Sequence, residues 1–125
     1  MILRKVLLVD DEEDIRKVGH LSLSRVGGWQ TVLASSGAEG VARAAAERPD
    51  LILLDVMMPG MDGPTTFQQL RAQEATASTP IIFMTAKSQK HEVASYLELG
   101  ALGVIGKPFN PLTLPAEIKK LLPSS

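Results

Sequence analysis

The sequence predicts an α/β fold in which a parallel sheet is covered by helices on both faces. Short apolar runs alternate along the chain with segments whose apolar residues recur at helical spacing. Several runs are apolar at every position, as expected of strands that meet water on neither side. Repeated strand–helix units joined by right-handed crossovers form a doubly wound sandwich with an open sheet.

Five runs are expected to form the strands, because each is short and rich in β-branched residues or leucine. They are residues 6–9, 31–33, 51–54, 81–84 and 104–105. Trp29 and the five methionines are expected to fill the core, whereas His20 and His91 match no metal-ligand spacing and are expected at the surface.

The first helix is expected to carry Ile15, Val18, Gly19, Leu23 and Val26 on one stripe that faces the sheet, and to end at the following pair of glycines. The second, residues 38–48, is rich in alanine and stops before a proline. Both segments have the length of ordinary amphipathic helices.

The third helix opens with Gly63 and Pro64, and the fourth is expected over residues 88–99, ending at Gly100. The last contains Pro115, which would disrupt a helix interior. If Thr113 caps this helix, the proline falls in the first turn, where no intrahelical donor is needed. We therefore expect a late start for the fifth helix.

Length and composition fit one soluble domain that spans residues 1–125. The 13 basic and 14 acidic residues give a net charge of −1, so we expect no direct binding to nucleic acid or to a membrane. There is no cysteine and no apolar run long enough to span a bilayer, and we expect no targeting segment. Cytoplasm is the expected location.

Polar residues stand at the carboxyl ends of four predicted strands. Asp10 and Asp11 follow the first strand, Asp55 ends the third, Thr85 ends the fourth and Lys107 ends the fifth. Open parallel sheets place their sites at this edge, so the five side chains are expected to meet there.

Three carboxylates at one edge would repel one another unless a cation neutralised them, and their oxygens suit a hard ion such as Mg²⁺. An aspartate can attack phosphorus and form an acyl phosphate, for which Asp55 is the candidate. The Thr85 hydroxyl and the Lys107 ammonium could then compensate the charge of the phosphoryl oxygens.

Each of these residues also has a structural interpretation. Asp10 and Asp11 could cap the first helix, Asp55 could be a turn residue, and a threonine or lysine at a strand end is often a plain surface residue. Their joint placement at one edge favours the functional interpretation.

Four motifs in this order resemble the receiver domain of bacterial response regulators. They are Val-Asp-Asp-Glu at 9–12, Leu-Asp-Val-Met-Met-Pro-Gly-Met-Asp-Gly at 54–63, Met-Thr-Ala at 84–86 and Gly-Lys-Pro-Phe at 106–109. The resemblance covers essentially the whole chain. It implies a flavodoxin-like (βα)5 fold with strand order 2-1-3-4-5, and a cis peptide between Lys107 and Pro108.

The resemblance also implies roles for the site residues. Asp55 is the phosphoacceptor, and Asp11, Asp55 and the main-chain carbonyl of Met57 ligate Mg²⁺, with Mn²⁺ as a substitute and Asp10 acting mainly through metal-bound water. Thr85 and Lys107 bind the phosphoryl oxygens.

Family members receive the phosphoryl group from a histidine kinase, a phosphotransfer protein or a small acyl phosphate, and they assist its transfer without being ordinary enzymes. Phosphorylation then alters a surface around the fourth helix, fifth strand and fifth helix, which binds a downstream protein that the sequence does not identify. Such a protein is expected to be a monomer or weak dimer.

The sequence departs from the family pattern at Val104, where many relatives have an aromatic residue that swings inward on activation. A valine has no ring to exchange between rotamers, so switching would run through the backbone and the fourth helix. On that helix, Tyr96 is either an output contact or an ordinary half-buried residue. In this family, the positions of Met57 and Lys87 tune the phosphoryl lifetime.

Three alternatives remain. An aspartate-nucleophile phosphatase would want an acid two residues after Asp55, where Met57 stands. A flavodoxin-like cofactor binder would want a glycine-rich phosphate loop after the first strand, where Asp10 and Asp11 stand. Finally, the chain could be a receiver cut from a longer regulator or a hybrid kinase.

Overall fold

The computed structural model describes residues 2–87 and 89–123. Five strands form one parallel sheet in the order β2-β1-β3-β4-β5, which confirms the expected fold class. The strands are β1 (Lys5–Val9), β2 (Gln30–Ala34), β3 (Leu51–Asp55), β4 (Ile81–Thr85) and β5 (Gly103–Gly106). Each contains the run predicted for it and extends one or two residues further.

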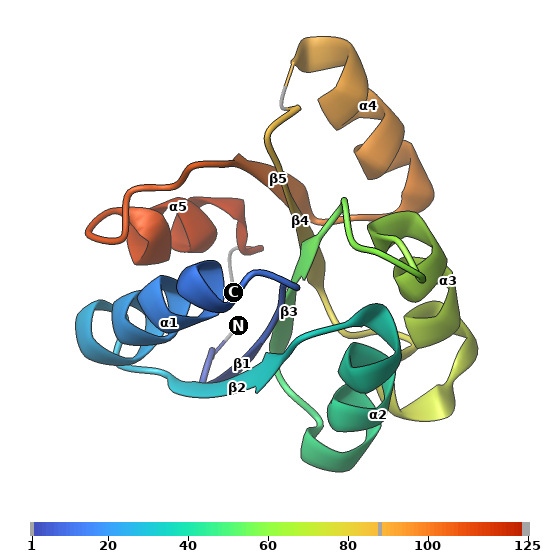
Figure 1. Cartoon of the computed structure of the whole chain (residues 1–125), viewed down its shortest axis with the longest axis horizontal. Helices are drawn as coiled ribbons and strands as arrows, with labels where there is room; N and C mark the ends of the chain where they lie inside the picture. The colour runs from blue at the N-terminus through green and yellow to red at the C-terminus, as the bar shows by residue number, and fades with distance from the viewer. Residues whose placement is uncertain (1, 88, 124–125) are drawn as a thin grey trace.

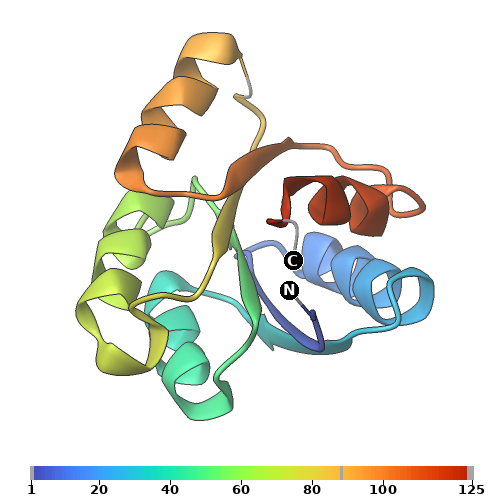
Figure 2. The same ribbon diagram turned by 180° about the vertical axis from the view of Figure 1, so that it is seen from behind.

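Five α-helices cover the sheet in two layers. They are α1 (Glu13–Leu21), α2 (Gly37–Glu47), α3 (Gly63–Ala72), α4 (Lys90–Leu99) and α5 (Leu114–Leu121). Helices α1 and α5 lie on one face of the sheet, and α2, α3 and α4 lie on the other (Figure 1). The same division is visible from behind in Figure 2.

Each face of the sheet carries its own hydrophobic cluster. Leu7 and Val9 of β1 point into the cluster that contains Phe67 and Leu70 of α3. Val6 and Leu8 point into the opposite cluster, which packs against α1 and α5. Because successive strand residues point to opposite faces, both sets are buried and the run in the sequence is apolar throughout.

Helix boundaries follow local signals. The Asp62 carboxylate accepts the Thr65 amide hydrogen at 2.9 Å and so caps α3. Helix α4 ends at Gly100, whose φ of 110° suits a residue without Cβ. Helix α5 follows Thr113 and has its proline in the first turn, as predicted, although the Thr113 side chain makes no capping bond.

The prediction for the first helical segment was partly wrong. After α1 the chain continues as a π-helical turn, η1 (Ser22–Val26), and the side chains of Val18 and Val26 are 40% and 50% exposed. Gly19 packs closely against Leu8 and defines the side of α1 that faces the sheet. Val18 therefore points sideways, about 100° away, and the wider π turn rotates Val26 outward.

The predictions for the burial of single residues were confirmed in some cases and wrong in others. Trp29 is buried, and His20 and His91 are exposed, as expected. Met57 is 68% exposed, so the expectation that all methionines fill the core was wrong for this residue. The predicted start of the fourth helix at residue 88 lies outside the described residues. The 3₁₀ turn η2 (Glu74–Thr76) was not predicted.

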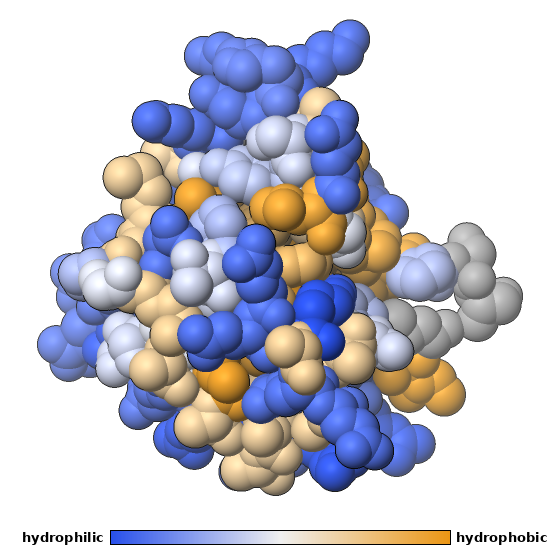
Figure 3. Space-filling model, turned by 90° about the vertical axis from the view of Figure 1, so that its right-hand side faces the viewer, coloured by the Kyte–Doolittle hydropathy of each residue, from blue (hydrophilic) through white to orange (hydrophobic). Residues whose placement is uncertain are grey.

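The side of the molecule formed by α2, α3 and α4 is strongly hydrophilic where α4 projects at the top, with hydrophobic patches below it (Figure 3). Within residues 2–87 and 89–123, no helix is long and apolar enough to cross a membrane.

Candidate functional site

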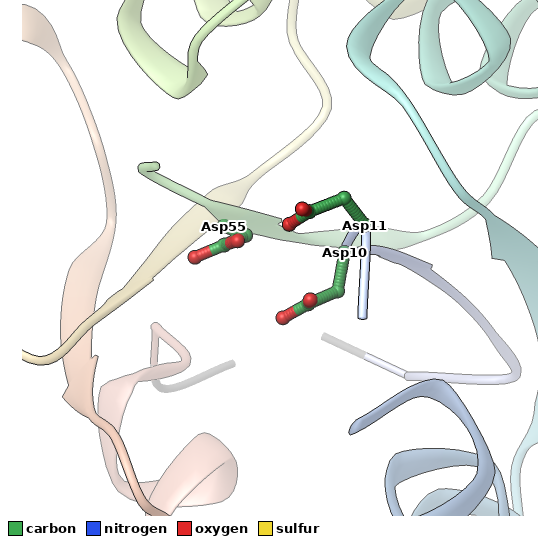
Figure 4. A group of neighbouring side chains, drawn as sticks. All are labelled: Asp10, Asp11 and Asp55. Carbon is green, nitrogen blue, oxygen red and sulfur yellow. The ribbon is translucent and has the colours of Figure 1, made fainter. Parts of the chain in front are cut away.

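The sheet brings all five predicted side-chain residues to one edge. Asp10 and Asp11 directly follow β1, Asp55 and Thr85 are the last residues of β3 and β4, and Lys107 directly follows β5. The three aspartates gather at the ends of β1 and β3 (Figure 4). This convergence confirms the placement that the strand-end rule predicted.

The three carboxylates form a cluster that could hold a metal ion. One oxygen from each of Asp10, Asp11 and Asp55 lies within 4.8 Å of the others. Asp10 and Asp55 are buried, with 0% and 3% of their surface exposed, whereas Asp11 is partly exposed. The cluster is therefore anchored on its buried side and accessible on the other.

Lys107 compensates part of this negative charge. Its Nζ lies 2.9 Å from Asp10 Oδ2, 3.3 Å from Asp55 Oδ1 and 3.9 Å from Glu12 Oε1. Burial lowers the pKa of Lys107, but hydrogen bonds and charge from Asp10 and Asp55 outweigh it, so the pKa is raised overall. The lysine is thus a cation throughout the neutral pH range.

Asp55 is the group whose ionisation the fold disfavours. Burial is the largest cause, followed by repulsion from Asp10, and together they raise the pKa of Asp55 to about 6 despite the opposing effect of Lys107. One lysine does not offset three clustered carboxylates. A further positive charge would stabilise the ionised Asp55, and all-oxygen donors suit a hard divalent cation.

The local backbone holds Asp10 in place. Its Oδ1 accepts the Glu12 amide hydrogen at 2.9 Å, and its main-chain carbonyl accepts a bond from Arg16 Nη1 at 2.8 Å. The interpretation of Asp10 and Asp11 as helix caps was wrong, because Glu12 is the N-cap residue of α1 and no side chain makes a capping bond there.

A pocket of about 320 Å³ opens beside Asp55, and its lining includes Met57, Thr85 and Lys107. Thr85 Oγ1 accepts the amide hydrogen of Lys87 at 3.0 Å, which leaves the hydroxyl hydrogen free to be donated into the pocket. The Asp55 carboxylate therefore borders a pocket whose wall also carries a hydroxyl group and an ammonium group.

Gly63 allows α3 to approach the end of β3. A Cβ at this position would lie 2.7 Å from the Asp55 carbonyl oxygen, and the Gly63 amide donates to the Val56 carbonyl at 2.8 Å. Only glycine fits here without a shift of the backbone.

Glu12, Ile15 and Pro108 were not predicted to lie at the site, but they also line the pocket. Glu12 directly follows the aspartate pair in the first motif, and this adjacency was the available signal. Because its side chain is 63% exposed, Glu12 stands at the mouth of the site beside Lys107.

The family model that describes the response regulator receiver domain matches residues 6–119. The chain belongs to the response-regulator receiver family. Among curated proteins, it is 41% identical over 119 residues to the alkaline phosphatase synthesis transcriptional regulatory protein PhoP of Bacillus subtilis. The aligned region covers 95% of this chain and 48% of that protein. The chain thus spans about half the length of the curated relatives it matches.

Solved receiver structures have the same fold. The chemotaxis response regulator CheY4 of Vibrio cholerae superimposes with a TM-score of 0.88 at 34% identity, over 97% of this chain and 100% of that chain. The receiver domain of a histidine kinase from Syntrophus aciditrophicus superimposes with a TM-score of 0.80 at 34% identity, over 95% of this chain and 89% of that chain. Receivers of this fold therefore occur both in response regulators and in kinases.

Proposed function

We propose that this receiver accepts a phosphoryl group on Asp55 and passes the signal to another protein. The observation that carries the proposal is the position of the Asp55 carboxylate, which is buried at a strand end, within 4.8 Å of two further carboxylates and 3.3 Å from an ammonium group. Membership of the response-regulator receiver family supports the same conclusion.

The donor set suits Mg²⁺, with Mn²⁺ as a substitute. Asp11, Asp55 and the main-chain carbonyl of Met57 would hold it, and Asp10 would act mainly through bound water. When bound, the ion would neutralise the carboxylates and the incoming phosphoryl oxygens. The raised pKa of Asp55 supports this assignment, because the ionised carboxylate lacks sufficient compensating charge from protein groups alone.

In the proposed phosphoryl transfer, Asp55 is the nucleophile, and Lys107 and Thr85 bind the transferred group. An Asp55 oxygen attacks phosphorus and forms a P–O bond, while the bond between phosphorus and the leaving group of the donor breaks. The leaving group departs as an imidazole, if the donor is a phosphohistidine, or as a carboxylate, if it is an acyl phosphate. Lys107 and Thr85 then bind the phosphoryl oxygens. To do so, Lys107 gives up part of its hydrogen bond to the Asp55 carboxylate.

The proposed donors are a histidine kinase, a phosphotransfer protein or a small acyl phosphate. Residues 1–125 would act as one receiver domain in the cytoplasm, either alone or as part of a longer regulator or hybrid kinase. Its output would be a changed surface around α4, β5 and α5 that binds a downstream protein. The receiver would assist its own phosphorylation and dephosphorylation without turning over a separate substrate.

Intact-mass spectrometry after incubation with Mg²⁺ and acetyl phosphate tests the proposal. The wild type should gain the mass of one phosphoryl group, and Asp55→Asn should gain none. Asp62→Asn is a matched control, because Asp62 lies on the same loop but is exposed, and asparagine also caps helices well. Equal labelling of Asp55→Asn, or labelling of the wild type without a divalent ion, would refute the assignment.

The same samples test the phosphatase alternative. Val56 and Met57 follow the nucleophile, so no side chain there can protonate a leaving alkoxide. We expect no sustained release of phosphate from added phosphate esters.

A further inference from the structure

Met57 carries an exposed thioether beside the Asp55 pocket. Its side chain is 68% exposed, whereas those of Met58 and Met84 are 8% and 0% exposed, and Met61 is only partly exposed. The chain has no cysteine, so the thioethers of its methionines are its only sulfur atoms. Among the described methionines, Met57 is therefore the one that a dissolved oxidant reaches first.

Two pockets meet at this side chain. One is the pocket of about 320 Å³ that Met57 lines together with Asp55, Thr85 and Lys107. The other has a volume of about 470 Å³, follows β3, and is lined by Val56, Met57, Met58, Pro59, Asp62 and Pro64. Met57 is the residue common to both linings. A change in the polarity of its side chain therefore alters the surroundings of Asp55 directly.

The residues on either side of Met57 are held in place. The Val56 amide donates to the Met84 carbonyl at 3.1 Å, and the Val56 carbonyl accepts the Gly63 amide hydrogen at 2.8 Å. Met58 packs into the hydrophobic cluster under α2, α3 and α4. The exposure of Met57 is thus built into the fold, and because its side chain adds little to the core, a chemical change there should leave the fold intact.

We propose that Met57 is a modification site at which peroxides control the lifetime of the phosphorylated form, an inference that rests on the function proposed above. The sulfur attacks one oxygen of hydrogen peroxide, so that an S–O bond forms and the O–O bond breaks. The proton on the transferred oxygen passes to the departing hydroxide, which leaves as water. The thioether is oxidised to a sulfoxide and the peroxide is reduced. A methionine sulfoxide reductase restores the thioether at the expense of a pair of thiols, which become a disulfide.

The sulfoxide should shorten the lifetime because it replaces an apolar wall with a polar one. A thioether is a weak hydrogen-bond acceptor, whereas the sulfoxide oxygen binds water well. Water held in the wall of the Asp55 pocket is positioned to attack the phosphoryl group. We expect the oxidised protein to lose its phosphoryl group at least about threefold faster than the reduced protein.

The order of oxidation is tested on the unphosphorylated protein. After timed exposure to hydrogen peroxide, tandem mass spectrometry of tryptic peptides locates each added oxygen; fragmentation is needed because one peptide contains Met57, Met58 and Met61. Met57 should be oxidised at least about tenfold faster than Met58 or Met84, in line with its exposure. Equal rates at Met57 and Met58 would overturn the assignment of the site.

The effect on lifetime is tested by comparing each protein with and without earlier peroxide treatment. Wild type, Met57→Leu and Met61→Leu are oxidised, freed of peroxide, phosphorylated with Mg²⁺ and acetyl phosphate, and followed by intact mass after the donor is removed. Met61→Leu is the matched control, because Met61 lies on the same loop and is partly exposed. Peroxide should accelerate the loss in wild type and Met61→Leu but not in Met57→Leu. Treatment with the reductase and dithiothreitol before phosphorylation should restore the wild-type lifetime.

The outcomes separate this inference from the proposed function. A wild-type lifetime that peroxide leaves unchanged, or an equal acceleration in Met57→Leu, would overturn the control by Met57. Far-ultraviolet circular dichroism of the treated proteins checks that oxidation has not unfolded them. If the untreated wild type gained no phosphoryl group, the proposed function would fail and the effect on lifetime with it, whereas the order of oxidation is measured without phosphorylation.

Discussion

The carboxylate of Asp55 is held where its negative charge is costly. It is 3% exposed and lies beside the equally buried Asp10, and Lys107 is shared between the two. The consequence is a pKa of about 6 against an ordinary 3.8. A folded-state pKa above the unfolded one means that the protonated carboxyl stabilises the fold, and that this stabilisation is lost as the pH rises through about 6.

We therefore expect Asp55→Asn to stabilise the protein in the absence of divalent ions. At pH 8 the variant should exceed the wild type by about 2–3 kcal/mol in free energy of unfolding, because the amide carries no charge to desolvate. The difference should shrink toward zero near pH 4, where the wild-type carboxyl is protonated. Urea unfolding followed by Trp29 fluorescence measures both values, and a difference independent of pH would contradict the cause assigned to the shift.

Met57 is a second residue whose surroundings predict an effect. Its side chain is 68% exposed and lines the pocket beside Asp55. We expect it to hinder water that attacks the phosphoryl group, and Lys87 to add positive charge nearby. Met57→Asn should shorten the lifetime of the phosphorylated form several-fold, measured as loss of phosphoryl mass after the donor is removed. An unchanged lifetime would count against this role.

At the residue scale, the sequence predicted which side chains meet but not how they share charge. Asp10 and Asp11 are adjacent in the chain. The Asp10 side chain is fully buried and forms an ion pair with Lys107, whereas Asp11 is partly exposed to solvent. That difference depends on the turn after β1, where Asp10 accepts the Glu12 amide hydrogen. No pattern in the sequence distinguishes two adjacent aspartates in this way.

At the scale of the elements, continuous apolar runs were a reliable signal because helices cover both faces of the sheet. The π-helical turn after α1 was not predictable, since it depends on tertiary contacts such as that of Ser22 with Pro111. The exposure of Val18 follows from the close approach of Gly19 to Leu8, which sequence spacing does not reveal.

Helix α4 differs from the other helices because none of its residues is buried. Tyr96 is its main contact with the core, and its ring lies 5.0 Å from that of Phe83, two residues before Thr85. Phe83 in turn stacks on Phe67 of α3 at 5.6 Å. The half-buried position predicted for Tyr96 is confirmed, and it makes this ring the anchor of α4.

Tyr96→Ala should therefore loosen α4 locally. Loss of a half-buried ring should lower the free energy of local opening by about 1–2 kcal/mol, so amide hydrogens in α4 should exchange about tenfold faster. Tyr96→Phe keeps the ring and serves as the control. Hydrogen exchange measured by mass spectrometry resolves the α4 peptides, and equal protection in Tyr96→Ala would show that other contacts hold the helix.

At the scale of the whole molecule, the two hydrophobic clusters share a single sheet. Leu54 belongs to the cluster under α2, α3 and α4, whereas Trp29 belongs to the cluster under α1 and α5. Neighbouring residues of the same strands supply both clusters. If the helices on one face of the sheet came away, the strands that support the other cluster would be exposed as well. We therefore expect the domain to unfold as one unit.

This cooperativity can be tested with one core substitution. Leu54→Ala should lower the free energy of unfolding by about 2–5 kcal/mol, as is usual for a fully buried leucine. The same loss should appear in Trp29 fluorescence, on the opposite face of the sheet, and in far-ultraviolet circular dichroism, which reports all helices. If Trp29 fluorescence kept the wild-type transition while the dichroism shifted, the two clusters would be separate folding units. A structural change at the carboxyl ends of the strands could then not affect both faces of the sheet.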